Sequence, residues 1–256
     1  MRALRTLLAG IALAGCMTAM WAGPALAQET ELPNEHWSFQ SVFGGFDLAA
    51  AQRGFQTYSQ VCSNCHSMHL LHYRDLAGIG LDEAQVKAVA AAVTVPQGLD
   101  DQGNPKEGPA TPASQFKSPF PNEQAARAAN NGALPPDLSL IVNAREGGPN
   151  YVYGILTGYA DPPADFKMQE GMHYNKVFPG HQIAMPQPLT DGSVEYTDGT
   201  PNNLRQEAHD VVTFLYWAAN PEMVTRKQIG VRVILFLMFM TGLTYALKRK
   251  VWSDVH

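Results

Sequence analysis

Cys62-Ser-Asn-Cys-His66 is the stretch of this sequence that decides its fold. Two thiols three positions apart on one helical turn can meet the two vinyl groups of one porphyrin, and the next residue can then place an imidazole under the iron. Cys62 and Cys65 are therefore predicted to attach one haem c covalently, with His66 as its proximal iron ligand.

Two other kinds of site could use the same residues. A zinc ion could bind the two thiols and a nearby histidine such as His69 or His72, but adjacent Cys65 and His66 do not suit one tetrahedral centre, and no second ligand pair follows. A thioredoxin-like redox pair would need a strand before it within a βαβ unit, whereas the residues before Cys62 are typical of a helix. The haem site is favoured over both.

The second axial ligand must come from farther along the chain, because the residues just after His66 cannot easily reach the opposite haem face. The downstream candidates are Met168, Met172, His173, His181 and Met185. Met185 stands out because Pro186 and Pro188 stiffen its loop. His181 is the alternative and would make a bis-His centre, whereas a thioether raises the reduction potential relative to a second imidazole.

The N-terminus has the pattern of an export signal. Arg2 and Arg5 give a basic start, residues 6–15 form an apolar run too short for a membrane span, and Ala-Leu-Ala at 25–27 is typical of a cleavage site. In the alternative interpretation, Cys16 follows a lipobox-like Leu-Ala-Gly and becomes a lipidated N-terminus. After cleavage the haem motif holds the only two cysteines.

The C-terminal region is predicted to cross a membrane. Residues 229–247 are apolar and span roughly 28 Å as a helix, enough for the hydrocarbon layer. Lys248, Arg249 and Lys250 follow directly, and the positive-inside rule places them in the cytoplasm. A buried core helix is the alternative. The predicted segments are a signal peptide at 1–27, a periplasmic haem domain at 28–225, an anchor at 226–250 and a cytoplasmic tail at 251–256.

Helical patterns and loop signals divide the outer domain. Helices are expected over 47–60, 81–95, 122–130, 138–144, 151–157 and 201–219, the last capped by Thr200 with Pro201 in its first position. The segments 96–121 and 161–198 are rich in proline and glycine and are predicted to be surface loops.

The outer domain is strongly acidic. Residues 28–225 hold 22 acidic and 10 basic side chains, a formal charge of −12. Such a surface repels nucleic acid and attracts basic proteins, although the charge could serve solubility alone.

Several ordered segments carry a resemblance to a known family. They are RGFQTY at 53–58, CSNCHSM at 62–68, AARAANNGALPPDLS at 125–139, AREGGPNYVY at 144–153, LTGY at 156–159, FPG at 178–180, DGTP at 198–201, FLYWAA at 214–219, and KR at 248–249 before WS at 252–253. Over nearly the whole mature chain, the sequence resembles the cytochrome c1 family, the haem subunit of ubiquinol–cytochrome c reductase.

The resemblance implies a set of site residues. It implies Met185 as the sixth iron ligand, and it implies that Asn130, Pro135, Arg145 and Tyr151 line the haem or contact its propionates. A guanidinium is also the natural partner of a carboxylate, which gives Arg145 independent support. Asn130 and Pro135 could instead be helix-end and turn residues. Some bacterial relatives carry a disulfide before the Met ligand, and this chain has no cysteine for it.

The fold is accordingly expected to be mainly α, a class I cytochrome c-like haem domain with long loop insertions and one C-terminal transmembrane helix. The resemblance implies one-electron transfer in the bacterial inner membrane, from the Rieske iron–sulfur protein beside cytochrome b to a basic soluble or tethered c-type cytochrome, within a dimeric complex. No bond-making catalysis is expected of these residues. The alternatives are a free-standing membrane-tethered cytochrome c and an exported disulfide oxidoreductase.

Overall fold

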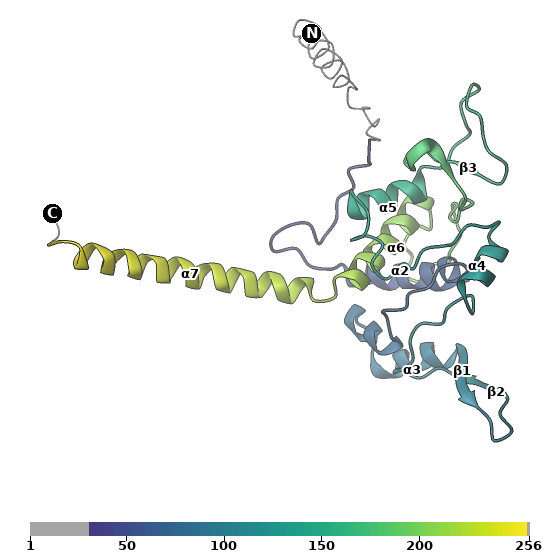
Figure 1. Cartoon of the computed structure of the whole chain (residues 1–256), viewed down its shortest axis with the longest axis horizontal. Coiled ribbons are helices and arrows are strands. Elements are labelled where there is room, and N and C mark those ends of the chain that lie inside the picture. Colours follow the sequence, from purple (N-terminus) through teal and green to yellow (C-terminus); the bar gives the residue numbers. More distant parts are fainter. Residues whose placement is uncertain (1–30, 255–256) are drawn as a thin grey trace, which may run out of the picture. The chain divides into compact units, whose positions relative to one another are not determined.

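The computed structural model describes residues 31–254, and helices predominate in it (Figure 1). The predicted signal peptide and the alternative lipidation site at Cys16 lie outside these residues. The elements in chain order are α2 (Leu48–Gln60), η2 (Cys62–Asn64), η3 (Tyr73–Ile79), α3 (Glu83–Ala91), β1 (Thr94–Leu99), β2 (Pro105–Pro109), α4 (Glu123–Ala129), α5 (Gly148–Thr157), β3 (His173–Tyr174), η4 (Pro179–His181), β4 (Gln182–Ile183), α6 (Leu204–Ala219) and α7 (Met223–Val251). The mainly α fold with one long C-terminal helix is confirmed.

Helices α2 and α6 pack against each other at the centre of the predicted haem domain, and α5 packs on α6 (Figure 1). The carboxylate of Asp47 caps α2 by accepting a hydrogen bond from the Ala50 amide at 3.0 Å. A Cβ atom at Gly54 would collide with the backbone of Asp210 on α6. This close crossing therefore requires glycine, and it lets the two helices bury a shared apolar stripe that includes Tyr58.

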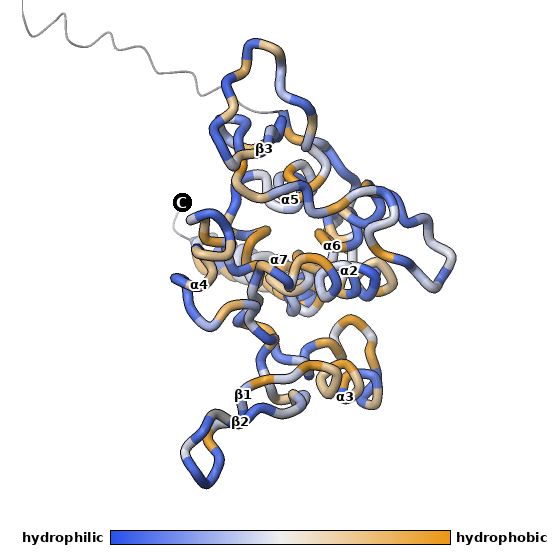
Figure 2. The backbone as a smooth tube through the Cα atoms, turned by 90° about the vertical axis from the view of Figure 1, so that its right-hand side faces the viewer, coloured by the Kyte–Doolittle hydropathy of each residue, from blue (hydrophilic) through white to orange (hydrophobic). Residues whose placement is uncertain are grey.

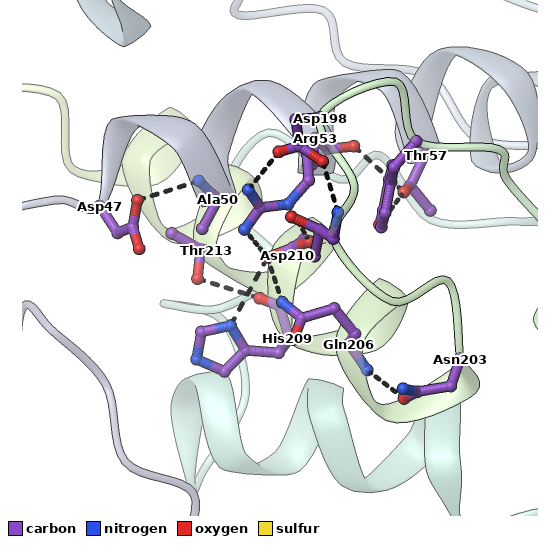
Figure 3. A network of polar contacts seen from close by, with 12 residues as sticks. Asp47, Ala50, Arg53, Thr57, Asp198, Asn203, Gln206, His209, Asp210 and Thr213 are labelled. Carbon is purple, nitrogen blue, oxygen red and sulfur yellow. Dashed lines mark hydrogen bonds and ion pairs between the residues drawn. The ribbon is translucent and has the colours of Figure 1, made fainter.

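An ionic network fastens the same two helices (Figure 3). Arg53 on α2 donates from Nε and Nη2 to the fully buried carboxylate of Asp210, at 2.7 and 3.1 Å. Its Nη1 also reaches Asp198, in the loop before α6, at 2.9 Å. Gln206 donates a third hydrogen bond to Asp210 at 3.0 Å. The buried charge is thus paired and satisfied from α2 and from its own helix.

The predicted helix at 81–95 is wrong at its C-terminal end. Helix α3 ends at Ala91, and β1 then pairs antiparallel with β2, with Thr94 opposite Pro109. Thr94 and Val95 are β-branched, and Pro96 has no amide proton for a helix, so the chain turns into a strand. The segment 96–121 is consequently not all loop. Figure 2 shows the tip of this hairpin in mainly hydrophilic colours.

Two further helix predictions differ from the structure. Residues 138–144 form turns, in which the amides of Ile141 and Asn143 donate to carbonyls only three residues earlier, those of Leu138 and Leu140, at 3.3 and 3.0 Å. Helix α6 begins at Leu204 with Asn203 as its cap, not at Pro201, because the Thr200 amide bonds the carboxylate of Asp198 in a turn. The other predicted helices lie within two or three residues of α2, α4 and α5.

Helix α7 has 29 residues and contains the predicted span at 229–247. It is the one helix of residues 31–254 that is long and apolar enough to cross a membrane. Its first residue, Met223, is buried against the haem domain, whereas most side chains from Ile229 onward are exposed. Lys248, Arg249 and Lys250 form its last turn.

Candidate functional site

The two cysteines lie on one tight turn at the end of α2. The amides of Cys65 and His66 both donate to the carbonyl of Cys62, at 3.1 and 2.9 Å, so the motif is closed on itself. Both thiols are free. Cys62 packs against the main core, where burial raises the pKa of its thiol to about 12, and Cys65 is exposed. A pair of free thiols on one helical turn fits the vinyl groups of a porphyrin.

The alternative sites for these thiols find no support. His69 bonds the carboxylate of Asp137 at 2.7 Å and the hydroxyl of Ser118 at 3.0 Å. Within residues 31–254, no three His, Cys, Asp or Glu side chains are grouped so as to hold a metal ion. The element before Cys62 is helix α2 and not a strand, which argues against a thioredoxin-like pair.

The imidazole of His66 is oriented by a main-chain carbonyl. Its Nδ1 lies 2.8 Å from the carbonyl oxygen of Pro136, and because a carbonyl can only accept, Nδ1 carries the proton. The lone pair is then on Nε2, which is the arrangement that a histidine ligand needs. Burial also lowers the pKa of His66, favouring the neutral form that binds metals. The donor set of this turn therefore fits an iron porphyrin.

Asp137 holds the Pro136 carbonyl in place, and sequence reasoning missed it. Its carboxylate accepts hydrogen bonds from the Ser67 hydroxyl at 2.8 Å, the His69 amide at 2.8 Å and the Ser139 amide at 2.9 Å. Although burial opposes its ionisation, these bonds lower the pKa of Asp137 to about 2. The segment after Pro135 is thus tied to the residues that follow the haem motif.

Asn130 and Pro135 lie near this segment. Asn130 ends α4, where its side-chain amide donates to the Ala126 carbonyl at 2.8 Å and its own carbonyl accepts from Ala133. Pro135 and Cys65 both line a surface hollow of about 860 Å³. These contacts give Asn130 a helix-end role and place Pro135 beside the motif. A haem contact for either residue stays a prediction.

The structure brings Arg145 and Tyr151 together. Arg145 is exposed, and among the described residues its guanidinium donates only to the Ala144 carbonyl, at 3.1 Å. Tyr151 is half-buried in the first turn of α5, where burial raises the pKa of its phenol and the nearby Arg145 partly offsets the rise. The four remaining guanidinium protons, in an exposed position, suit an anionic ligand such as a propionate.

Met185 follows β4 and joins a second, smaller core. This cluster is built on Ile155, Val177 and Ile183, and Tyr151 packs against it together with Met185. The hydroxyl of Tyr159 donates to the Met185 carbonyl at 2.9 Å. Two predicted site residues, distant in sequence, therefore share one cluster, and Tyr159 is a further residue that holds the Met185 loop.

The other candidate ligands lie in different surroundings. Met168, Met172 and His173 line a separate hollow with Tyr174 and Gln187. His181 has a left-handed backbone, and its ring lies 5.8 Å from that of Tyr174, with Nδ1 3.3 Å from the Asn175 carbonyl.

Asn175 fastens the loop that leads to Met185, and nothing in the sequence pattern marked it. Its fully buried side chain donates to the Ile155 carbonyl on α5 at 2.8 Å and accepts from the amides of Val177 and Phe178. Its backbone amide also donates to the His181 carbonyl at 3.0 Å. The long irregular loop is therefore ordered by one buried amide and not by a disulfide.

Comparisons with known proteins identify the family of this chain. The model of the Cytochrome C1 family matches residues 37–255. Cytochrome c1 of Rhodospirillum rubrum is 45% identical over 251 residues, covering 91% of this chain and 92% of that protein. A mitochondrial cytochrome c1 heme protein of Solanum tuberosum is 48% identical over 224 residues, covering 87% and 86%. "Cytochrome b/c1" of Bradyrhizobium diazoefficiens is 46% identical over 246 residues, and the chain spans 36% of its length.

Proposed function

We propose, because the chain belongs to the cytochrome c1 family, that it passes single electrons from a Rieske iron–sulfur protein to a periplasmic c-type cytochrome. The family is the electron-transfer haem subunit of the bc1 complex, in which it works with cytochrome b and the Rieske protein, and α7 fits a single-pass membrane protein. Quinol oxidation is assigned to the other subunits, and the complex is proposed to be dimeric.

The proposed site divides the work among named residues. One covalent haem c supplies the electron acceptor and donor, by changing its iron between two oxidation states. Cys62 and Cys65 hold it through thioethers, which prevent its loss. His66 and Met185 are the proposed axial ligands, and Arg145 is the proposed partner of a propionate.

One observation carries this proposal, the hydrogen bond between Nδ1 of His66 and the Pro136 carbonyl at 2.8 Å. It fixes the tautomer and the ring orientation before any metal is bound, and Asp137 fixes the carbonyl in turn. A zinc-bound histidine uses the same kind of partner, so it is the place of His66 directly after two free thiols that favours a haem. Such a constrained imidazole, directly after two free thiols, is what axial ligation requires.

The topology follows from charge. Lys248, Arg249 and Lys250 are proposed to lie in the cytoplasm and residues 28–225 in the periplasm. A reporter that is active only in the periplasm should work when fused after Asn220 and be silent after His256. The opposite pattern would reverse the orientation.

Redox spectroscopy of membranes tests the electron path. Added quinol should reduce the haem c in wild-type membranes and leave it oxidised in membranes that lack the Rieske protein. A double Cys62→Ala, Cys65→Ala variant should lose the haem stain on a denaturing gel. Quinol reduction without the Rieske protein, or a protein that never co-purifies with a b-type cytochrome, would favour a free-standing cytochrome instead.

The acidic outer domain supports the proposed acceptor. A domain of charge −12 should attract a basic cytochrome over about one Debye length, roughly 8 Å at physiological salt. The bimolecular rate of electron transfer should therefore fall steeply with ionic strength in stopped-flow mixing. A rate that salt leaves unchanged would mean that the acidity serves solubility only.

A further inference from the structure

A loop before α2 presents an exposed apolar tip that the haem site does not use. This loop, residues 38–46, carries Val42 and Phe43, which are 67% and 89% exposed. Phe43 is the most exposed large apolar side chain in residues 31–254. In Figure 1 the loop is the purple segment that precedes α2 beside the start of α7. Two neighbouring apolar residues held in water at a loop tip point to a missing partner.

The loop is fastened to the first turns of α7 by one lysine. Nζ of Lys227 donates to the carbonyl oxygens of Phe39 at 2.7 Å, Ser41 at 2.7 Å and Gly44 at 3.2 Å. Three acceptors match the three protons of an ammonium group. The chain at Gly45 also lies against the side chain of Val224, one turn earlier on α7. The loop and the start of α7 therefore form one piece.

The base of the loop is rigid, so its tip has a defined direction. The ring of Phe39 stacks on that of Tyr216 on α6, with centroids 3.8 Å apart and planes 6° apart. Phe46 lies against the same tyrosine at 6.2 Å. A Cβ atom at Gly44 would collide with the Ser38 carbonyl, which shows how tightly the loop closes. Val42 and Phe43 are left outside this packed base.

The position of Lys227 gives the height of the loop. The apolar run of α7 begins at Ile229, two residues later, which is about 3 Å along the helix axis. The carbonyls of Ser41 and Gly44, on either side of the tip, therefore lie close to the level where α7 enters the hydrocarbon layer. Arg226 lies next to Lys227, and Arg232 lies about 8 Å farther along the helix axis. Positive charge near the loop favours anionic lipid headgroups over an uncharged protein surface.

We propose that Val42 and Phe43 insert into the lipid interface as a second membrane contact beside α7. The ligand is the boundary between headgroups and acyl chains, where apolar side chains of surface-bound segments are buried. A single helix leaves the attached domain free to turn about the helix axis. A second contact fixes both the turn and the height of the haem motif above the membrane. The proposal rests on α7 crossing the bilayer.

Spin labels on the full chain in its native membrane complex test this contact. A nitroxide on Phe43→Cys should collide several times more often with oxygen, which enters lipid, than with a water-soluble nickel chelate, measured with the haem reduced. Leu99→Cys in the β1–β2 hairpin, where Leu99 is 68% exposed, should show the reverse and serves as the aqueous control. Leu237→Cys, eight residues into the apolar run, is the lipid control.

The outcomes separate the possible partners. A label at position 43 that behaves like the one at 99, while 237 is in lipid, overturns the proposal and leaves the membrane anchor intact. A label shielded from both reagents also overturns it, and would assign the tip to a protein surface such as cytochrome b. If the label at 237 is itself exposed to water, α7 does not cross the membrane, and the proposed contact of the loop is overturned with it.

Discussion

The hydroxyl of Tyr159 offers a sharp test of how the Met185 loop is held. Tyr159→Phe removes the 2.9 Å hydrogen bond to the Met185 carbonyl, yet keeps the ring that packs against the second cluster. Losing the donor while the acceptor stays half-buried costs about 1–2 kcal/mol. The loss destabilises the ordered conformation of the Met185 loop and leaves the proposed covalent attachment of the haem unchanged.

The expected consequence is a more open sixth coordination position. If Met185 is the ligand, a loss of about 1–2 kcal/mol raises the population with the ligand dissociated by a factor of about 5–30. Carbon monoxide binds only this open form, so its apparent affinity should rise by the same factor. Titration of the dithionite-reduced complex with carbon monoxide measures it directly.

Tyr174→Phe is the matched control for this test. Tyr174 is also half-buried beside the same loop, and among the described residues its hydroxyl makes no hydrogen bond. Its carbon monoxide affinity should stay at the wild-type value. If carbon monoxide binds Tyr159→Phe as it binds wild type but binds Met185→Leu much more tightly, the hydrogen bond does not have the proposed role. If carbon monoxide binds neither Tyr159→Phe nor Met185→Leu more tightly, Met185 is not the ligand.

Five further substitutions test the proposed iron ligand, the buried ion pair and a buried glutamate. Met185→Leu, close in volume, should keep the haem stain but lower the midpoint potential and admit carbon monoxide, and His181→Asn should do neither; the reverse pattern would make His181 the ligand. Asp210→Ala should lower the free energy of unfolding by about 3–5 kcal/mol, because it strands a mostly buried arginine. Asp198→Ala, at a 45% exposed carboxylate, should cost less than about 1 kcal/mol, and equal losses in urea unfolding would contradict this account. Burial raises the pKa of Glu207, so its ionisation weakens folding as the pH rises above the ordinary glutamate pKa of 4.5. Glu207→Gln should therefore gain stability relative to wild type as the pH rises above that value, and a gain that does not change with pH would count against this account.

The sequence predicted the parts of the fold whose signals are local. Helix α2 has a capping aspartate and one apolar face, and the span within α7 has length and flanking charge, so each could be recognised within its own segment. Residues 138–144 have an equally apolar pattern but form turns. The Leu138 amide is bonded to the distant Ser67 carbonyl, and Ile141 and Asn143 bond carbonyls three residues earlier, and sequence spacing carries no record of these partners.

In the candidate site, too, only the residues with a local sequence signal could be predicted. Cys62, Cys65 and His66 were recognisable because their donor atoms are side-chain atoms at a fixed spacing. Asp137 and Asn175 were not, since each acts through hydrogen bonds to backbone groups far away in sequence. An acidic residue in a turn and an asparagine in a loop have many ordinary explanations.

Main-chain carbonyls matter on both sides of the proposed iron. The Pro136 carbonyl accepts from the ring of His66, and the Met185 carbonyl accepts from the hydroxyl of Tyr159. The first contact would orient a strong ligand, His66, that the proposed covalent attachment keeps close. The second would hold the proposed thioether ligand, Met185, on a loop that has no disulfide. Because the weak ligand lacks any covalent help, the free energy of its hydrogen-bonded loop adds directly to ligation. The second carbonyl contact should therefore influence the reduction potential more than the first.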